Sequence, residues 1–461
     1  MSNQVPAVHR RLAIRGDVIL PGDAEYDSAR RVHNLLHDRF PAVIVRPVDA
    51  DDVVSAVRYA SENGLTIAVR GGAHSGAGYG TIDDGLVIDL SRMRAISVNP
   101  AARVARAQGG ITAGEFTAAT SPHGLVTPFG DAPTVGVGGI TIGGGVGYLT
   151  RKLGMTIDSL LAAEIVTADG HKIRTSETEH PDLFWAIRGG GGNFGILTEL
   201  EFRLHPVNMV LGGPLFLPAT RETVRGVIEL TQKAPEDLTT ISAVMRFMPS
   251  PMMPEAVHNR VTLMVIPVWA GDLDAGQQVL APFRALATPF ADFIHPTPFI
   301  GMYEEGGGPG EHYTSLVRSF MGNSLDDAAI DAMLDHFAAD RVPSQRSMTV
   351  AQIRVLGGAM ARVPSDATAF SHRDAQVLIG FAAVGFDPSE YPAHLAWVES
   401  LYNAVRHHAT GSYLNFLEDE GDSRIRQAYS AATYQRLAEV KRRYDPNNLF
   451  RHNPNIAPAK A

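Results

Sequence analysis

Hydrophobic residues near the start of the chain follow two different periods. Residues 41–45 (PAVIV) and 65–69 (LTIAV) are short apolar runs rich in β-branched side chains, as is typical of buried strands. Between them, Val53, Val57 and Ala60 recur at helical spacing. The pattern therefore predicts a strand, a helix and a second strand.

Polar residues mark both ends of this predicted helix. Asp51 and Asp52 can cap its N-terminus, and Asn63 followed by Gly64 is typical of a C-terminus. Residues 85–90 (GLVIDL) then repeat the strand pattern. The segment up to this point is expected to form a β-α-β unit followed by a further strand.

Three glycine-dense segments interrupt the first 206 residues: RGGAHSGAGYG at 70–80, GVGGITIGGGVG at 136–147 and RGGGGNFG at 188–195. The first connects strand to strand. The third follows a predicted helix at 181–187 and precedes a predicted strand at 196–204. Three such loops in one region suggest a single extended ligand lying across it.

Beyond about Pro206 the pattern changes to strands and helices without regular alternation, which predicts an α+β cap domain. The predicted strands are 261–271, 351–363 and 375–386, and the predicted helices are 326–340 and 391–408.

Composition narrows the possible functions. The chain has 461 residues, of which 45% are hydrophobic and 19% charged, so it can bury a large core and is expected to form two domains. A formal charge of -9 disfavours a nucleic-acid partner, because such a partner requires a basic face.

The chain contains no cysteine, which excludes disulfides, thiolate metal sites and a cysteine nucleophile. No apolar run reaches membrane-spanning length, and residues 1–16 do not resemble a signal peptide. The sequence is therefore expected to encode a cytoplasmic protein without a membrane partner.

Sequence context excludes three common kinds of site. Gly190, Gly192 and Gly195 satisfy the dinucleotide pattern G-x-G-x-x-G, but that site requires a strand before the motif and a helix after it, whereas here a helix precedes and a strand follows. Ser75 lacks the flanking glycines of a hydrolase nucleophile elbow. The neighbours His407 and His408 are expected on different faces of a helix, so no metal site is predicted.

The remaining interpretation of the glycine segments is a cradle of backbone amides. Glycines allow consecutive N–H groups to turn toward one anion and allow the chain to approach a flat ligand closely. A pyrophosphate joined to an aromatic ring system would suit such a cradle, although each loop taken alone could be only a tight turn.

These motifs in combination resemble the FAD-linked oxidase family that includes vanillyl-alcohol oxidase, and within it the berberine-bridge-like branch. The resemblance covers about Arg46 to Pro206 and the last fifty residues, on VRGGAHSGAGYG, PTVGVGGITIGGGVGYLTRKLGMTIDSL, EIVTADG, DLFWAIRGGGGNFGI, SYLNF and YDPNNLFRHNPNI. It implies an α+β, two-domain FAD-binding fold with an antiparallel-sheet cap domain. The expected parts are an FAD-binding domain at 1–206, a cap at 207–409 and a C-terminal segment at 410–461 that returns to the first domain.

The resemblance places His74 where the family attaches the flavin through its 8α-methyl carbon, which requires a neutral imidazole as nucleophile. Many members have a second bond from a cysteine, but here Ala132 occupies that place. Two further departures are Ile140, where a histidine is common, and Ala73, where the family usually has glycine. A single covalent bond to FAD is therefore expected.

The resemblance also implies which other residues contact FAD. Val166 is expected to meet the adenine through its backbone, and Val137 lies where small or β-branched residues accompany oxygen reactivity; Val137 could equally be core in a strand-like V-G-V. The full expected set is Arg70, Gly71, Gly72, Ala73, His74, Ser75, Gly78, Val137, Gly138, Gly139, Thr141, Gly144, Gly145, Gly147, Val166 and Asn453.

On the substrate side, Tyr413 and Asn415 match the family's Y-x-N motif and are the expected catalytic residues. The glutamate base of the plant enzymes is missing, since Arg362 occupies its place. Gln352 and Arg354 alternate with apolar residues and face either the substrate pocket or solvent.

The expected function is an FAD oxidase that takes hydride from a C–H bond next to a hydroxyl or amine of a small molecule and reduces dioxygen to peroxide. The alternatives are a dehydrogenase with another electron acceptor, an oxidative cyclase or oxygenase-like enzyme, and a flavin-binding protein without turnover. Neither the substrate nor the oligomeric state is encoded by a recognisable motif.

Overall fold

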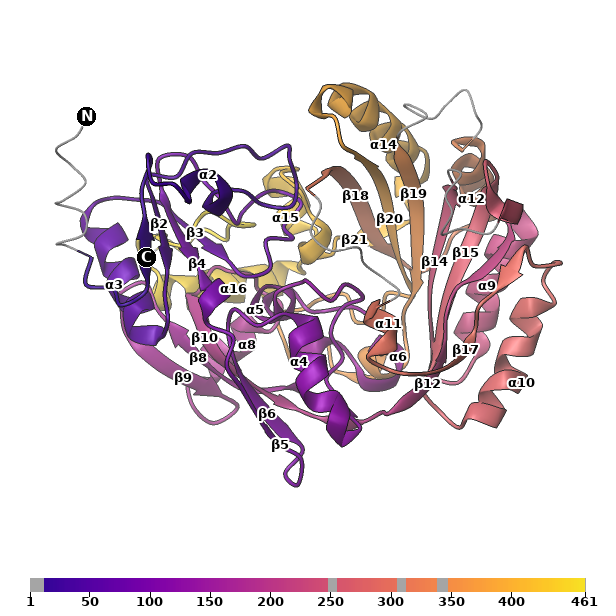
Figure 1. Ribbon diagram of the computed structural model, residues 1–461, viewed down its shortest axis with the longest axis horizontal. Coiled ribbons are helices and arrows are strands. Elements are labelled where there is room, and N and C mark those ends of the chain that lie inside the picture. The colour runs from indigo at the N-terminus through magenta and orange to yellow at the C-terminus, as the bar shows by residue number, and fades with distance from the viewer. Residues whose placement is uncertain (1–11, 248–254, 305–311, 338–346, 461) are drawn as a thin grey trace.

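The computed structural model describes residues 12–247, 255–304, 312–337 and 347–460. Strands β1 to β11 and their helices form one part, here called the N-terminal domain, and strands β12 to β21 form a second part, the cap domain (Figure 1). The C-terminal segment after β21 runs back to the N-terminal domain. Among the described residues, no helix combines the length and apolarity needed to cross a membrane.

The first sheet of the N-terminal domain has the order β1-β2-β4-β3. Its elements are β1 (Asp17–Ile19), α2 (Tyr26–Ala29), β2 (Val43–Arg46), α3 (Ala50–Glu62), β3 (Ile67–Arg70) and β4 (Leu86–Asp89). The predicted strand, helix and strand at 41–69 are confirmed, but β2 and β3 are not neighbours, since each pairs in parallel with β4 between them. Helix α3 connects β2 to β3 and packs Val53, Val57 and Ala60 against this sheet.

The expected N-cap of α3 was wrong by two residues. Asp49 caps the helix, and its carboxylate accepts the backbone N–H groups of Asp51 and Asp52. Asp52 is buried instead and accepts the N–H groups of Arg15 and Gly16. An aspartate beside a helix start can serve either role, and only the packing of the N-terminal segment separates the two.

The second sheet is antiparallel and has the order β5-β6-β10-β8-β9. The elements of this region are β5 (Ile96–Asn99), β6 (Val104–Gln108), α4 (Ala113–Thr120), β7 (Leu125–Val126), α5 (Val137–Ile142), α6 (Thr150–Leu153), α7 (Thr156–Ser159), β8 (Leu160–Val166), β9 (Lys172–Ser176), α8 (Pro181–Ile187), β10 (Ile196–Arg203) and β11 (His205–Pro206). Phenylalanines of α4, of the loop after β7 and of β10 pack edge to face in its core. The glycine loops therefore lie on a rigid support.

The cap domain is built on one antiparallel sheet of order β16-β13-β15-β14-β19-β20-β18-β21; in addition, β12 pairs with β15, and β17 pairs with β12. Its strands are β12 (Met209–Gly212), β13 (Leu215–Pro218), β14 (Leu238–Arg246), β15 (Val261–Trp269), β16 (Ala291–Asp292), β17 (His295–Pro298), β18 (Thr314–Gly322), β19 (Met348–Val355), β20 (Val377–Gly385) and β21 (Ala409–Gly411). The antiparallel cap sheet expected from the resemblance is thereby confirmed.

Helices α9 (Arg221–Lys233), α10 (Leu273–Arg284), α12 (Asp327–Asp335) and α14 (Tyr391–Val405) pack on the side of the cap sheet away from the N-terminal domain (Figure 1). The short α11 is Gly301–Glu304. The predicted helices at 326–340 and 391–408 correspond to α12 and α14, although residues 338–340 lie outside the described residues. The strand predicted at 351–363 ends at Val355, because Ala359–Arg362 forms the helix α13 after two glycines with positive φ.

A buried arginine joins the two domains. The side chain of Arg151, on α6, donates to the backbone carbonyls of Leu238, Leu356 and Ala234 in the cap domain. All three guanidinium nitrogens therefore have acceptors, which offsets part of the free energy of removing the charge from water. Burial lowers the pKa of Arg151.

The C-terminal segment is held by a buried lysine. It contains α15 (Asp422–Arg426) and α16 (Ala431–Tyr444), and α16 lies along the N-terminal domain (Figure 1). Lys441, which is fully buried, donates to Asp445 Oδ2 at 2.6 Å and to the carbonyls of Asn193 and Phe450. This one ammonium group joins α16, the third glycine segment and the chain tail.

Lys441→Met is expected to lower the free energy of unfolding by about 3–5 kcal/mol, because it leaves the buried Asp445 carboxylate without its partner. Urea denaturation followed by circular dichroism measures this change. Lys172→Met removes an exposed lysine that pairs with Asp51 and is the control. Equal urea midpoints for the two variants would contradict the structural role of Lys441.

Candidate active site

The first glycine-dense segment is an irregular loop between β3 and β4, as the sequence predicts. A Cβ atom added to Gly72 would lie 2.4 Å from both the nitrogen of Gly136 and the carbonyl oxygen of Thr134. The first and second glycine segments thus touch backbone to backbone, which only a residue without a side chain permits. Ala73 has φ 59°, a left-handed conformation that is strained for alanine.

His74 lies half-buried in this loop with its ring held on two sides. Its Nε2 is 2.8 Å from Thr134 Oγ1, and its ring centroid is 4.3 Å from that of His33. Burial, reinforced by His33, lowers the pKa of His74 to about 4. The imidazole is therefore neutral at physiological pH and retains a lone pair for nucleophilic attack.

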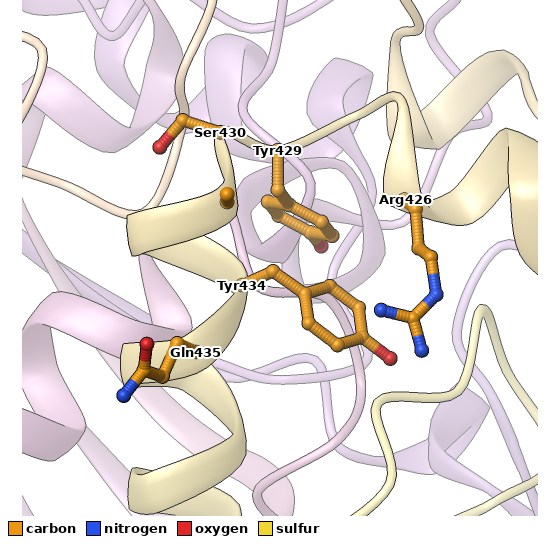
Figure 2. Close-up of a pocket in the computed structure, with 6 residues that line it drawn as sticks. Arg426, Tyr429, Ser430, Tyr434 and Gln435 are labelled. Atoms are coloured by element: carbon orange, nitrogen blue, oxygen red, sulfur yellow. The ribbon is translucent and has the colours of Figure 1, made fainter.

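A cavity of about 410 Å³ opens beside His74. The first glycine segment lines it through Arg70, Gly71, Gly72 and Ala73, and His33 and Thr134 lie on its other walls. A second hollow of about 440 Å³ lies on the C-terminal segment, where the guanidinium of Arg426 lies 4.4 Å from the centre of the Tyr434 ring (Figure 2). Residues 426–435 line this second hollow, and it includes none of the predicted site residues.

The second glycine segment begins with a helix. Val137 is the first residue of α5 and is fully buried in the core of the N-terminal domain, so the core interpretation is confirmed, although Val137 begins a helix and not a strand. Thr141 donates to the carbonyl of Val137 within the same helix. A Cβ atom on Gly139 would meet nothing within 4 Å, which leaves open space beside this helix.

Other glycines of the predicted set are required by protein packing. An added Cβ would lie 2.5 Å from Met155 at Gly144, 2.0 Å from Thr156 at Gly145, 2.0 Å from the Phe129 carbonyl at Gly147 and 2.3 Å from His37 at Gly78. For Gly138 the nearest atom is the carbonyl oxygen of Gly109, at 3.1 Å. Ser75 accepts the backbone N–H of Tyr79, and Val166 is fully buried at the end of β8.

Tyr413 and Asn415 lie against the second glycine segment. The backbone N–H groups of Gly145 and Val146 donate to the Tyr413 hydroxyl oxygen at 3.0 and 3.1 Å. The Asn415 amide donates to the same oxygen at 3.1 Å and to the carbonyl of Ile140 at 3.0 Å. Three N–H donors converge on one phenol oxygen, an arrangement that favours negative charge there.

Burial nevertheless raises the pKa of Tyr413, while the three N–H donors and the positive charge of Arg354 act in the opposite direction. The side chain is 1% exposed and packs with Met155, Phe370 and Phe416. Tyr413 is thus both part of a small apolar cluster and the acceptor of a polar network.

The three cap residues considered in the sequence analysis, Gln352, Arg354 and Arg362, differ in how deeply their side chains are buried. Arg354 is buried and its Nη2 is 2.7 Å from Asp131 Oδ2 of the N-terminal domain, so it does not lie on a solvated face of the sheet. Gln352 is half-buried and accepts the Nε–H of Arg354 at 3.0 Å. Arg362 is exposed and pairs with Glu236. Met360 of the same helix α13 is buried in the cluster that contains Tyr413.

Residues near the chain end reach the third glycine segment. Asn453 donates to the carbonyls of Gly192 and Phe450, while its Oδ1 and that of Asn455 are buried without a hydrogen-bond partner among the described residues. The third segment lies between α8 and β10, which confirms that it lacks the strand-to-helix context of a dinucleotide-binding turn.

Several residues of this site were not predicted from the sequence. His33 and Asp131 belong to no quoted motif, and Thr134 stands in the motif PTVGVGG without having been predicted as a site residue. Only the fold brings them beside the predicted residues. Lys441 has the spacing of a surface i, i+4 pair with Asp445, so its burial could not be predicted.

The expectation about His407 and His408 was wrong in its reasoning. Both residues lie in a 3₁₀ turn beyond the end of α14, and their ring centroids are 4.2 Å apart. Their nitrogens and a carboxylate oxygen of Asp326 lie within 4.8 Å of one another. The helical argument for different faces does not apply once the helix has ended.

Comparison with known proteins identifies the family. Residues 41–176 match the FAD binding domain model, and residues 412–457 match the model described as berberine and berberine like. (R)-6-hydroxynicotine oxidase of Paenarthrobacter nicotinovorans is 32% identical over 462 residues, which cover 97% of this chain and 98% of that protein. The chain is a berberine-bridge-like FAD-linked oxidoreductase.

Further relatives share the whole architecture of this family. The uncharacterised FAD-linked oxidoreductase YgaK of Bacillus subtilis (strain 168) is 32% identical over 456 residues, covering 97% and 98% of the two chains. The crystal structure of 6-hydroxy-D-nicotine oxidase from Arthrobacter nicotinovorans superimposes with a TM-score of 0.84 at 28% identity, covering 97% and 99%. Glucooligosaccharide oxidase from Acremonium strictum, with 6-S-cysteinyl, 8α-N1-histidyl FAD, gives 0.86 at 25% identity, covering 97% and 98%. These relatives confirm the two-domain α+β fold.

The residues of this FAD-linked oxidoreductase fit the cofactor. Buried acceptor oxygens on Asn453 and Asn455 are free to receive its N–H and O–H groups. The close approach of Gly72 to Gly136 and the open space at Gly139 suit a flat ligand laid along the backbone. The cavity beside His74 continues this surface.

Gly72→Ala is expected to reduce the bound flavin per chain by about tenfold or more, because the new Cβ must push the first two glycine segments apart. The ratio of absorbance at the flavin and protein maxima measures the occupancy. Gly380→Ala in β20 is the matched control, since nothing lies within 4 Å of its added Cβ. Unchanged flavin content in Gly72→Ala would show that the cradle lies elsewhere.

Proposed function

We propose that this enzyme is an oxidase carrying FAD on a single covalent bond to His74. It would oxidise a C–H bond next to a hydroxyl or amine of a small molecule and pass the electrons to dioxygen, giving hydrogen peroxide. The observation that carries this proposal is the placement of a neutral His74 at one end of the two touching glycine segments and of the Tyr413 hydroxyl on the second of them.

Bound FAD would supply a two-electron acceptor that dioxygen can reoxidise. The first glycine segment would hold its pyrophosphate and flavin edge through residues 70–75 and Gly78. The second segment would contact the ring system from Val137 to Gly147, with Val166 at the adenine and Asn453 at the pyrimidine edge. Most of these contacts use backbone atoms, so their geometry depends on the packing of the loops.

His74 has the properties that a covalent attachment requires. Its pKa near 4 keeps the imidazole neutral above about pH 5, and Thr134 engages Nε2, which leaves Nδ1 for the flavin. The 8α-N1-histidyl linkage named for the Acremonium strictum relative supports this assignment. That relative also carries a 6-S-cysteinyl bond, which this cysteine-free chain cannot form.

His74→Ala is expected to abolish the covalent bond. Acid-denatured wild-type protein should show flavin fluorescence that migrates with the chain on a denaturing gel, whereas the variant should release its flavin completely. His171→Ala, which removes an exposed histidine paired with Asp169, is the control. A flavin-free wild-type band would refute the covalent bond and leave the FAD-dependent reaction in place.

Tyr413 would accept the proton of the substrate hydroxyl or amine while hydride leaves the adjacent carbon. The N–H groups of Gly145 and Val146 and the amide of Asn415 would stabilise the phenolate whenever it forms. Val137, at the start of α5, would leave room for dioxygen beside the flavin. The oxidase names of the relatives support dioxygen as the acceptor.

Tyr413→Phe is expected to lower kcat/KM by about 10²–10⁴-fold, the usual contribution of a positioned proton acceptor. Because burial raises the pKa of Tyr413, the wild-type rate should rise with pH through the neutral and alkaline range, as the reactive phenolate becomes more populated. The variant should lose this dependence. Peroxide formation with small alcohols and amines provides the assay, and Tyr391→Phe, at an exposed cap residue, provides the control.

If Tyr413→Phe keeps the wild-type rate and pH profile, a group other than Tyr413 accepts the substrate proton. Flavin content and melting temperature, compared across the three proteins, separate this outcome from a folding defect.

A further inference from the structure

The cap strand β19 carries a buried cation that the proposed reaction does not use. The side chain of Arg354 is 5% exposed, and its Nη1 is buried without any hydrogen-bond partner among the described residues. Guanidinium groups in protein interiors normally have acceptors for their N–H groups, because an unmatched buried donor is destabilising. The free Nη1 therefore indicates a ligand.

The other two nitrogens of Arg354 show how the group is held. Nη2 is 2.7 Å from Asp131 Oδ2, and Nε is 3.0 Å from Gln352 Oε1. Gln352 lies two residues earlier on the same strand and so faces the same side of the cap sheet. Two partners from different domains fix the plane of the guanidinium and leave one edge of it free.

Docking of the two domains does not explain this free edge. Arg151 crosses the same interface and matches each of its three nitrogens with a backbone carbonyl. An unpaired guanidinium nitrogen is not confined to Arg354, since the Nε groups of Arg246 and Arg373 are also buried without an acceptor among the described residues. Arg354 differs from them because its unpaired nitrogen is a terminal Nη group with two N–H donors, which can bind a partner that the protein itself does not supply.

Arg354 lies beside the Tyr413 site. Its Cζ is 5.3 Å from the centre of the Phe416 ring, and that ring is 5.1 Å from the ring of Tyr413. The charge of Arg354 also lowers the pKa of Tyr413. A group bound to Nη1 would therefore share the compartment in which Tyr413 meets the substrate.

We infer that Arg354 Nη1 binds an anionic oxygen substituent, a carboxylate or phenolate, on the substrate of this oxidoreductase. The inference rests on the proposed function, because it takes the Tyr413 side of the flavin as the substrate pocket. It extends that function by naming the substrate class, a small alcohol or amine that carries an anionic group. Carboxylate and phenolate oxygens accept hydrogen bonds and carry the charge opposite to that of the guanidinium.

The test compares two non-reacting probes of the same size on the flavin-loaded enzyme. Benzoate carries the anionic group, and benzamide is its neutral counterpart. Titration of the flavin absorbance gives a Kd for each probe without any turnover. Wild-type protein should bind benzoate about 10- to 100-fold more tightly than benzamide, as expected for one charge-assisted hydrogen bond in a buried site.

Arg354→Gln should abolish this preference, so that the ratio of the two Kd values is about one. Its affinity for benzamide should stay within about threefold of the wild-type affinity. Arg354→Lys should keep part of it, since the charge remains. Arg362→Gln removes an exposed arginine and should keep the full preference. Asp131→Asn removes the competing negative charge and should tighten benzoate binding while benzamide affinity stays constant.

Equal affinities of wild-type protein for the two probes would overturn the inference, and this result needs no variant to fold. A full benzoate preference in Arg354→Gln would also overturn it. A third result would also overturn the inference: the flavin spectrum of ligand-free Arg354→Gln differs from that of the wild type, while both probes bind with wild-type affinity. The partner of Nη1 would then be the flavin.

A negative result in the titration and a negative result in the activity assays refute different statements. A flavin released by acid, or a lack of peroxide, would refute parts of the proposed function and leave the measured probe preference standing. A lack of preference would leave the oxidase reaction standing and remove only the anionic substrate class.

Discussion

The buried ammonium of Lys441 is the interaction on which the site depends most. It connects α16 to the third glycine segment through the carbonyl of Asn193 and to the tail through the carbonyl of Phe450. Asn193, itself fully buried, extends the connection by accepting the N–H of Ile456 and donating to the carbonyl of Pro454. The C-terminal segment held in this way also contains Tyr413 and Asn415, which make their own hydrogen bonds to the second glycine segment.

The charged groups around the site divide its chemistry between two regions. Near His74, burial and the neighbouring ring of His33 keep the imidazole uncharged, which suits a nucleophile. Near Tyr413, three N–H donors and the field of Arg354 oppose the effect of burial, which still raises the pKa of the phenol. The same fold thus keeps an imidazole neutral at one end and a phenol protonated among N–H donors at the other.

Departures from the family pattern follow from the positions of the residues in the fold. Arg362, at the place of the plant enzymes' glutamate, is exposed on α13 and pairs with Glu236. In the proposed reaction, Tyr413 would take the substrate proton instead. Ala132, where many members of the family have a cysteine, could form no second flavin bond, and its neighbour Asp131 pairs with Arg354.

Local sequence alone determined the elements and the motifs of this protein. The helical spacing of Val53, Val57 and Ala60 predicted α3, and the order of helix, glycine segment and strand at 181–204 correctly excluded a Rossmann turn, because both signals depend on neighbours along the chain. Tertiary structure alone decided which groups meet. The ring contact between His33 and His74, the burial of Lys441 and the unpaired nitrogen of Arg354 arise from segments far apart in the chain. Their burial and partners, and with them their charge states, follow from packing that no local pattern encodes.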